Sequence, residues 1–164
     1  MKSNINSLAK AGMIGALYIA LTAVSAALGL ASGAVQIRIS EALCVLPVFA
    51  SAAIPGVTVG CFLSNIIFGG TIYDIVFGTL ATLIGAVICR MLRNLPLLAA
   101  VPTILSNAVI IPVVLIVSGA GGWNMLPYFM ATVGLGEVIA CGIFGTLLVW
   151  YLLKHPHTRE VLFR

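Results

Sequence analysis

The sequence predicts an all-α integral membrane protein: a single domain, residues 1–164, of six transmembrane helices with both termini in the cytoplasm. Hydrophobic residues make up 62% of the 164 residues and charged residues only 7%, and the mean hydropathy is strongly positive. A soluble domain of this length cannot bury so much apolar surface in its own core, so most of it must face lipid or other apolar helices. One helical crossing needs about 20 apolar residues, so the length allows about six crossings and no attached soluble domain.

Five apolar stretches predict the helices, because each is long enough for at least one crossing. The apolar run of the first stretch, from about Ala11 to Ala31, follows Lys2 and Lys10. It exceeds the roughly 7–15 apolar residues of a signal peptide, so we expect it to be retained as a helix. The stretches span residues 9–31, 42–69, 74–90, 97–118 and 127–153.

The stretch at residues 42–69 decides the topology, because a strong turn dipeptide, Pro55-Gly56, divides it into two short halves. If the stretch crossed once, Arg90 and Arg93 would lie on the outer side of the membrane. If it crosses twice, they lie on the inner side with both basic termini. The preference of Lys and Arg for cytoplasmic loops therefore favours two crossings. Burial among neighbouring helices, or local thinning of the bilayer, would let such short helices survive.

This topology places several polar side chains in the outer half of the bundle. Arg38 and Glu41 lie in a polar break between two apolar stretches, and Asp74 opens the fourth helix. Asn107 lies roughly 16 Å below the outer end of the fifth helix, and Glu137 roughly 15 Å below that of the sixth, at the usual helical rise. Two polar side chains of adjacent helices thus reach the same depth beneath further polar groups. The pattern predicts a cavity open to the outside.

Ionisable residues near the centre of a bilayer are costly, so they are usually functional or paired. Glu137 is therefore the strongest single indication of a functional residue. Its alternative role is a hydrogen bond that links it to a neighbouring helix. Asp74 is well placed to cap its helix, and the asparagines are well placed to bridge helices. Arg38 and Glu41 are placed to form a surface ion pair of little energetic value. The candidate substrate-binding residues are Glu137, Glu41, Asn107, Arg38, Asp74 and Asn65.

The sequence contains no catalytic or metal-binding pattern. It lacks HExxH, an intramembrane histidine, clustered aspartates and GxxxxGK[ST], and it has no basic stripe with interleaved aromatics for nucleic acid. We therefore expect no enzyme activity, cofactor or metal. Four single cysteines lie in apolar surroundings, where we expect small buried residues: Cys44, Cys61, Cys89 and Cys141.

Small residues recur along one face of the first helix, with the spacing that lets helices pack closely in a membrane. Such a face either packs within the bundle or docks another membrane subunit, and the pattern alone does not choose between the two. The stripe consists of Gly12, Ala16, Ala20, Ala23 and Ala27.

Four segments carry a family resemblance: VQIRISEAL, AAIPGVTVGCFLSN, YDIVFGTLATLIGA and VGLGEVIA. Together they resemble the QueT family, whose members are substrate-binding S components of energy-coupling factor (ECF) transporters linked to the uptake of queuosine precursors. The likeness covers about residues 9–150, and the C-terminal tail matches poorly.

The resemblance implies the membrane-embedded binding subunit of an importer in a bacterial plasma membrane. Its implied partners are a transmembrane coupling protein and two cytoplasmic ATPases, with a docking face at Ala16, Ala20 and Ala23. The implied ligand is a 7-deazaguanine, such as queuine or 7-aminomethyl-7-deazaguanine. We expect the loop at residues 32–41 to close over the ligand. The resemblance then implies that the partner reorients the whole bundle in the membrane.

The candidate residues suit this ligand class. A carboxylate accepts the adjacent ring N–H and amino group of a guanine-like edge, and an asparagine complements a carbonyl and a neighbouring donor. We expect Glu137 first and Glu41 second to meet that edge, and Arg38 to contact either the ligand carbonyl or Glu41. The alternatives are another vitamin-like ring compound such as riboflavin, or a membrane enzyme, an assembly factor or a structural protein, since a fold does not fix a function.

Overall fold

The computed structural model describes residues 2–30 and 35–163, and every element within them is helical. This confirms the predicted all-α class. Residues 32–34 of the predicted outer loop lie outside the described residues. The elements are α1 (Lys2–Ala27), η1 (Ile39–Val48), α2 (Ala53–Ile67), η2 (Asp74–Gly78), α3 (Thr79–Met91), η3 (Pro96–Leu98), α4 (Val101–Val117), η4 (Trp123–Met125), α5 (Leu126–Glu137), η5 (Val138–Gly145), α6 (Thr146–Lys154) and α7 (Pro156–Phe163), where η denotes a 3-10 or π segment.

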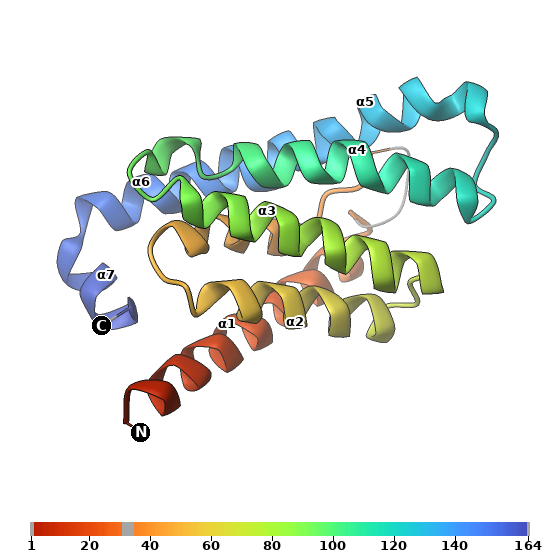
Figure 1. The fold of residues 1–164 in the computed structure, drawn as a ribbon. Helices are drawn as coiled ribbons and strands as arrows, with labels where there is room; N and C mark the ends of the chain where they lie inside the picture. The colour runs from red at the N-terminus through yellow and green to blue at the C-terminus, as the bar shows by residue number, and fades with distance from the viewer. Residues whose placement is uncertain (1, 31–34, 164) are drawn as a thin grey trace.

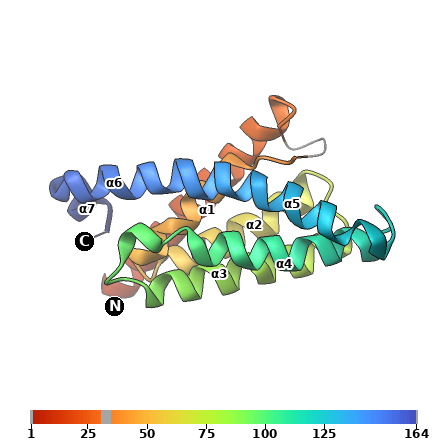
Figure 2. The same cartoon turned by 90° about the horizontal axis from the view of Figure 1, so that it is seen from above.

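The helices form an elongated bundle in which successive segments alternate in direction (Figure 1). α1, α2 and α4 run away from the end that holds both termini, and η1, α3 and the α5–α6 helix run back toward it (Figures 1 and 2). The turn after α3 lies at the end with the termini, and the turn between α4 and α5 lies at the opposite end (Figure 1). The two short segments η1 and α2 produce this alternation, which brings Arg90 and Arg93 to the end with the termini. η1 begins at Ile39, three residues before the predicted start at residue 42.

Four helices of the described chain are long and apolar enough to cross a membrane: Ile5–Ala27, Asp74–Met91, Pro96–Val117 and Trp123–Lys154. They confirm a multi-pass membrane protein. The two segments between the first and second of these helices are shorter, with 10 residues in η1 and 15 in α2. η1 is buried from Ser40 to Val48, because α1, α3 and η5 pack around it.

The break between the two short helices lies at residues 49–52, so the predicted break at Pro55-Gly56 is wrong in position. Pro55 stands in the first turn of α2, where backbone N–H groups have no intrahelical partner and a proline removes no hydrogen bond. Gly56 serves helix packing instead of a turn. A Cβ at Gly56 would lie 2.9 Å from the carbonyl oxygen of Ala11 in α1.

α1 packs against α2 through a different face from its stripe of small residues. A Cβ at Gly60 of α2 would lie 2.7 Å from the Cβ of Tyr18, so the two helices approach closely there. The stripe itself faces outward, and the alternative that it packs within the bundle is wrong for its exposed members. These are Gly12, Ala16, Ala20 and Ala27, while Ala23 is half-buried.

The last membrane span is one continuous helix, Trp123–Lys154, with the π segment η5 in its middle. Gly136 lies just before this segment, and its lack of a side chain lets residues 35–38 approach the helix closely. A Cβ at Gly136 would overlap the carbonyl oxygen of Gln36. This close approach brings the polar break of the sequence against the helix beside Glu137, and it thereby builds one wall of the site.

Candidate functional site

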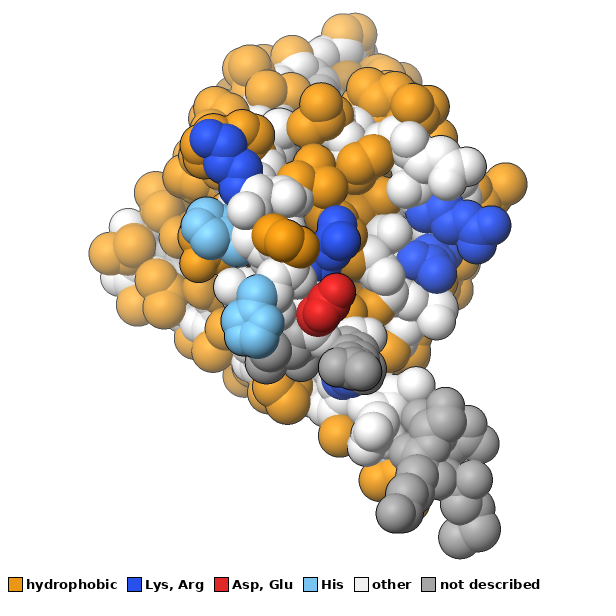
Figure 3. Space-filling view, turned by 90° about the vertical axis from the view of Figure 1, so that its left-hand side faces the viewer, with side chains coloured by type: hydrophobic (Ala, Val, Ile, Leu, Met, Phe, Trp, Pro, Cys, Tyr) orange, Lys and Arg blue, Asp and Glu red, His pale blue; other side chains and the backbone are white. Residues whose placement is uncertain are grey.

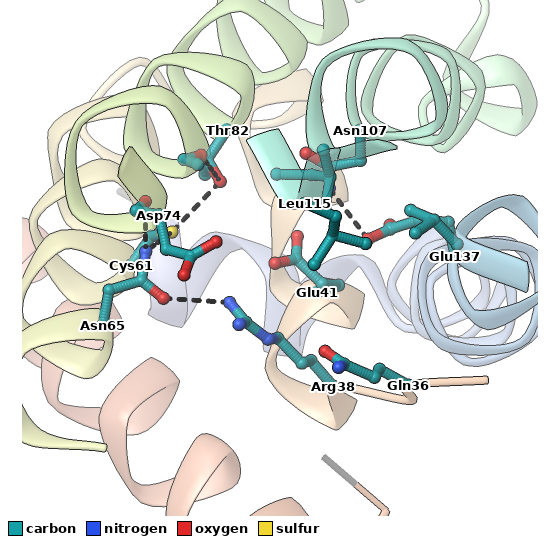
Figure 4. Close-up of a pocket in the computed structure, with 13 residues that line it drawn as sticks. Gln36, Arg38, Glu41, Cys61, Asn65, Asp74, Thr82, Asn107, Leu115 and Glu137 are labelled. Carbon is teal, nitrogen blue, oxygen red and sulfur yellow. Dashed lines mark hydrogen bonds between the residues drawn. The ribbon is translucent and has the colours of Figure 1, made fainter. Parts of the chain in front are cut away.

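A cavity lies within the half of the bundle away from the termini, and all six candidate substrate-binding residues line it (Figure 4). Its volume is about 60 Å³. The wall combines the 36–41 segment with α2, η2, α3, α4 and α5. The lining residues are Gln36, Arg38, Glu41, Cys61, Asn65, Asp74, Gly78, Thr82, Asn107, Ile111, Leu115, Val133 and Glu137.

Glu41 is buried, with only 3% of its surface exposed. Its carboxylate accepts a hydrogen bond from the Tyr18 hydroxyl at 2.5 Å and one from the Cys44 thiol at 3.2 Å. α1 and η1 together thus hold this side chain. The interpretation of Arg38 and Glu41 as a surface ion pair is wrong, because Glu41 lies inside the protein and uncharged groups donate these bonds.

Arg38 lies at the edge of the cavity and is oriented by an asparagine. Its Nη1 donates to Asn65 Oδ1 at 3.0 Å, and Asn65 Nδ2 donates in turn to the Asp74 carbonyl oxygen at 3.0 Å (Figure 4). Asn65 therefore links α2 to the start of η2, as predicted for a bridging asparagine. It also fixes the guanidinium beside the cavity.

Glu137 and Asn107 meet across α5 and α4, where Asn107 Nδ2 donates to Glu137 Oε1 at 2.8 Å. This confirms that the two side chains reach the same depth. The bond also confirms the alternative role of Glu137 as a link between helices. However, it uses only one carboxylate oxygen. The other, Oε2, is buried and accepts no hydrogen bond from the described residues.

Asp74 forms a reciprocal capping box with Thr71, the residue that precedes this helix. Asp74 Oδ2 accepts from the Thr71 backbone N–H at 2.9 Å and from its hydroxyl at 2.8 Å, and the Asp74 N–H donates to Thr71 Oγ1 at 3.2 Å. The predicted capping role is confirmed. Asp74 caps the helix and lines the cavity at the same time.

Sequence reasoning missed several parts of the site. Tyr18 contacts Glu41 from the buried face of α1, and no local pattern links the two residues. Thr82 donates to Cys61 Sγ at 3.3 Å and closes the wall between α3 and α2. Three apolar side chains complete the lining: Ile111, Leu115 and Val133. The spacing of these three residues on α4 and α5 is that of any apolar helix and does not mark them as lining a site. Only the depth of Asn107 and Glu137 indicated that a cavity lies at this level.

The cavity carries more negative than positive groups. Three carboxylates, those of Glu41, Asp74 and Glu137, face one guanidinium, that of Arg38, which gives a formal charge of −2. Each carboxylate inside the bundle is costly unless it is compensated. Such a cavity therefore favours a ligand that carries a positive charge or several N–H donors.

Cys44 and Cys61 belong to the site, because Cys44 bonds to Glu41 and Cys61 lines the cavity, whereas the aromatic residues near the same end do not. All four cysteines are free and buried, as predicted for small buried residues. Trp123, Tyr73 and Tyr128 are exposed and do not line the cavity, which agrees with an aromatic belt at the membrane interface. Among the described residues, no group of three His, Cys, Asp or Glu side chains is placed to hold a metal ion.

Polar side chains that converge on a cavity inside a multi-pass helical bundle are typical of membrane transporters and their binding subunits. The comparison with known families agrees. The chain belongs to the QueT transporter family, because the family model described as QueT transporter matches residues 8–154. This is close to the range over which the resemblance was predicted, and the whole of the C-terminal helix α7 lies beyond it. No curated protein and no solved structure matches the chain.

Proposed function

We propose that the protein is the substrate-binding S component of an ECF-type importer and that it binds a queuosine precursor of the 7-deazaguanine class, such as queuine or 7-aminomethyl-7-deazaguanine. The observation that carries the proposal is a pair of carboxylates, Glu137 and Glu41, that line one cavity in a member of the QueT transporter family. Buried Glu137 Oε2, which accepts no hydrogen bond from the described residues, is the atom that we assign to the ligand.

The lining supplies a complementary group for each part of a deazaguanine. A carboxylate accepts the ring N–H and the amino group side by side through charge-assisted hydrogen bonds. Glu137 is the first choice for this role, because Glu41 already accepts from Tyr18 and Cys44. The ligand carbonyl would accept from Arg38. Ile111, Leu115 and Val133 provide apolar surface for the flat ring, which supplies much of the binding energy in such sites.

Ligand entry requires part of the wall to move. A cavity of about 60 Å³ has room for a few water molecules and not for a bicyclic ring. The predicted loop at residues 32–41 ends earlier than expected, because residues 39–41 belong to the buried helix η1. We assign the movement to residues 35–38, which pack against the helix at Gly136 and carry Arg38 into the lining. This loop would open toward the outside and close over the bound ligand.

We propose six crossings with both termini in the cytoplasm of a bacterial cell. The alternating directions of the segments support this topology, because they gather the termini, Arg90 and Arg93 at one end, and Lys and Arg side chains favour the cytoplasmic side (Figure 1). η1 is too short to cross a bilayer on its own. Its burial from Ser40 to Val48 removes it from lipid and makes a short crossing feasible.

The proposed partners are a transmembrane coupling protein and two cytoplasmic ATPases. An exposed small-residue face on α1 supports docking, because close approach of two helices in a membrane requires small side chains at the contact. Ala16 and Ala20 are exposed, and Ala23 is half-buried beside them. A Cβ at Gly12 would meet nothing within 4 Å, so this surface is open.

The protein purified alone in detergent tests the proposal. Titration with queuine and with 7-aminomethyl-7-deazaguanine should give submicromolar dissociation constants, and riboflavin and pyridoxine should not compete. Tight binding of a flavin with no binding of either deazaguanine would identify an S component for another vitamin-like compound. Chemical conversion of the ligand by the protein alone would contradict a transport role and indicate an enzyme.

A further inference from the structure

A second hollow lies at the end of the bundle with the termini, far from the cavity of Figure 4. Its volume is about 620 Å³, and Arg90, Arg93 and Arg159 contribute three guanidinium groups to its lining, with one carboxylate from Glu160. The formal charge of these four groups is +2. Figure 3 views this end and shows Lys and Arg side chains gathered on it, bordered by hydrophobic surface.

Hydrogen bonds and aromatic packing shape this basic hollow. Arg90 Nη1 donates to the carbonyl oxygens of Pro47 and Val48 at 3.3 and 3.1 Å, so the end of η1 holds the guanidinium in place. Phe49 stacks on Phe163 with ring centroids 6.1 Å apart, and both rings line the hollow. Helix α7 is thereby held across the end of the bundle, and it brings Arg159 toward the arginines of α3 and the following turn.

The positions of the three arginines at the ends of membrane spans predict that they lie at the depth of lipid headgroups. Arg90 is next to the last residue of the span Asp74–Met91, and Arg93 lies in the short turn before the span that starts at Pro96. Arg159 belongs to α7, which directly follows the span ending at Lys154. The polar headgroup layer extends only about 5–7 Å beyond the hydrocarbon on each side. Guanidinium groups at the ends of spans therefore meet phosphates.

An apolar groove lies next to the basic hollow. Its volume is about 190 Å³, and it has Phe163 in common with the hollow. The groove runs between α1, η1 and α6, and its lining includes Ile14, Leu43, Leu46, Leu148 and Leu152. A basic hollow and a neighbouring apolar groove that share Phe163 provide the two parts that a phospholipid requires: one for the phosphate and one for an acyl chain.

We propose that this end of the protein binds an anionic phospholipid, with the phosphate among Arg90, Arg93 and Arg159 and one acyl chain past Phe163 in the groove. Arginine binds phosphate in a bidentate manner, and basic pockets between membrane-spanning helices are favourable sites for anionic headgroups. An acidic protein segment would use the charge but would leave the lipid-facing groove unexplained. A free phosphate ion would likewise not need the groove.

Lipid titration followed by native mass spectrometry tests this proposal on the delipidated full-length protein. Phosphatidylglycerol should bind more tightly than phosphatidylcholine. Each cation near the membrane surface changes the affinity for an anionic lipid about fivefold. Arg93→Gln should therefore weaken phosphatidylglycerol binding about fivefold. The double variant Arg93→Gln, Arg159→Gln should weaken it about 25-fold. Glu160→Gln, which removes the opposing charge, should strengthen binding about fivefold. Arg90 is left unchanged because it also holds η1.

Lys154→Gln is the matched control, since Lys154 lies at the same end but packs over the Trp150 ring and does not line the hollow. The proposal is overturned if Lys154→Gln weakens binding as much as Arg93→Gln, or if the two lipids bind equally. Inorganic phosphate that binds as tightly as phosphatidylglycerol would also overturn it. So would arginine variants that keep their lipid affinity and lose only the partner subunits, because the hollow would then be a protein interface.

Discussion

Asn107 of α4 donates a hydrogen bond of 2.8 Å to Glu137 of α5, and both side chains line the cavity where the two helices meet. The bond orients the carboxylate and leaves its second oxygen, Oε2, buried with no hydrogen bond from the described residues. A buried acceptor of this kind costs free energy unless a partner arrives. We therefore propose that Glu137 Oε2 accepts a hydrogen bond from the ligand.

Glu137→Gln should weaken binding of 7-aminomethyl-7-deazaguanine at least about tenfold, because it removes the charge from paired hydrogen bonds to the ligand. The fold should survive, since a glutamine oxygen still accepts from Asn107. Isothermal titration measures the affinity, and thermal unfolding measures the stability. Glu160→Gln removes a carboxylate outside the cavity and should leave ligand affinity unchanged. An unaltered affinity in Glu137→Gln would remove this residue from the ligand contacts.

The cavity should select a cationic ligand. Hydrogen bonds to Glu41 and Glu137 come from the uncharged groups of Tyr18, Cys44 and Asn107, so their charges are not neutralised by these donors. We expect 7-aminomethyl-7-deazaguanine to bind at least about tenfold more tightly than the neutral 7-cyano compound, the magnitude of one good charge-assisted hydrogen bond. Competition titration measures the ratio. Equal affinities would show that the cavity recognises the ring and that the charge of the substituent does not contribute to binding.

The sequence predicted the membrane fold well, because hydropathy and the placement of Lys and Arg vary along the chain in a way that needs no contact information. It also predicted two short helices within residues 42–69. The position of the break was wrong because a Pro-Gly dipeptide suits both a turn and the start of a helix. The packing of Gly56 against Ala11 of α1 shows that here the dipeptide belongs to the start of a helix and not to a turn.

The convergence of the six polar candidate residues on one cavity was also predictable from the sequence. In a chain with so few charges, each buried polar residue is costly, and topology alone brought these residues to one end of the bundle. Tyr18 was not predictable, because its partner Glu41 is 23 positions away and the contact depends on how α1 packs against η1. The orientation of Arg38 toward Asn65 likewise depends on tertiary structure.

Gly136→Ala should disturb residues 35–38, which form one wall of the cavity. An alanine Cβ there would overlap the Gln36 carbonyl oxygen, which is backbone and cannot rotate away, so residues 35–38 would be displaced. We expect a loss of roughly 1–3 kcal/mol in the free energy of unfolding, typical of overpacking, together with weaker ligand binding. Gly134→Ala is the control, since its Cβ would meet only Ala108 Cβ at 3.8 Å, an ordinary contact. Similar behaviour of both variants would contradict a specific role for the approach at Gly136.

Ala16→Trp and Ala20→Trp should each prevent assembly with the coupling protein and the ATPases while leaving ligand affinity unchanged. Both residues are exposed on α1, so a large side chain fits the isolated protein, but it would hold a partner helix away from the close contact that small residues permit. Leu105→Trp on α4 is the control, because Leu105 is 59% exposed and lies outside the stripe. Co-purification of the tagged partners measures assembly, and detergent titration measures ligand binding. Intact assembly in both α1 variants would show that the partners dock elsewhere, and loss of assembly in Leu105→Trp as well would show a general effect of bulk on the membrane surface.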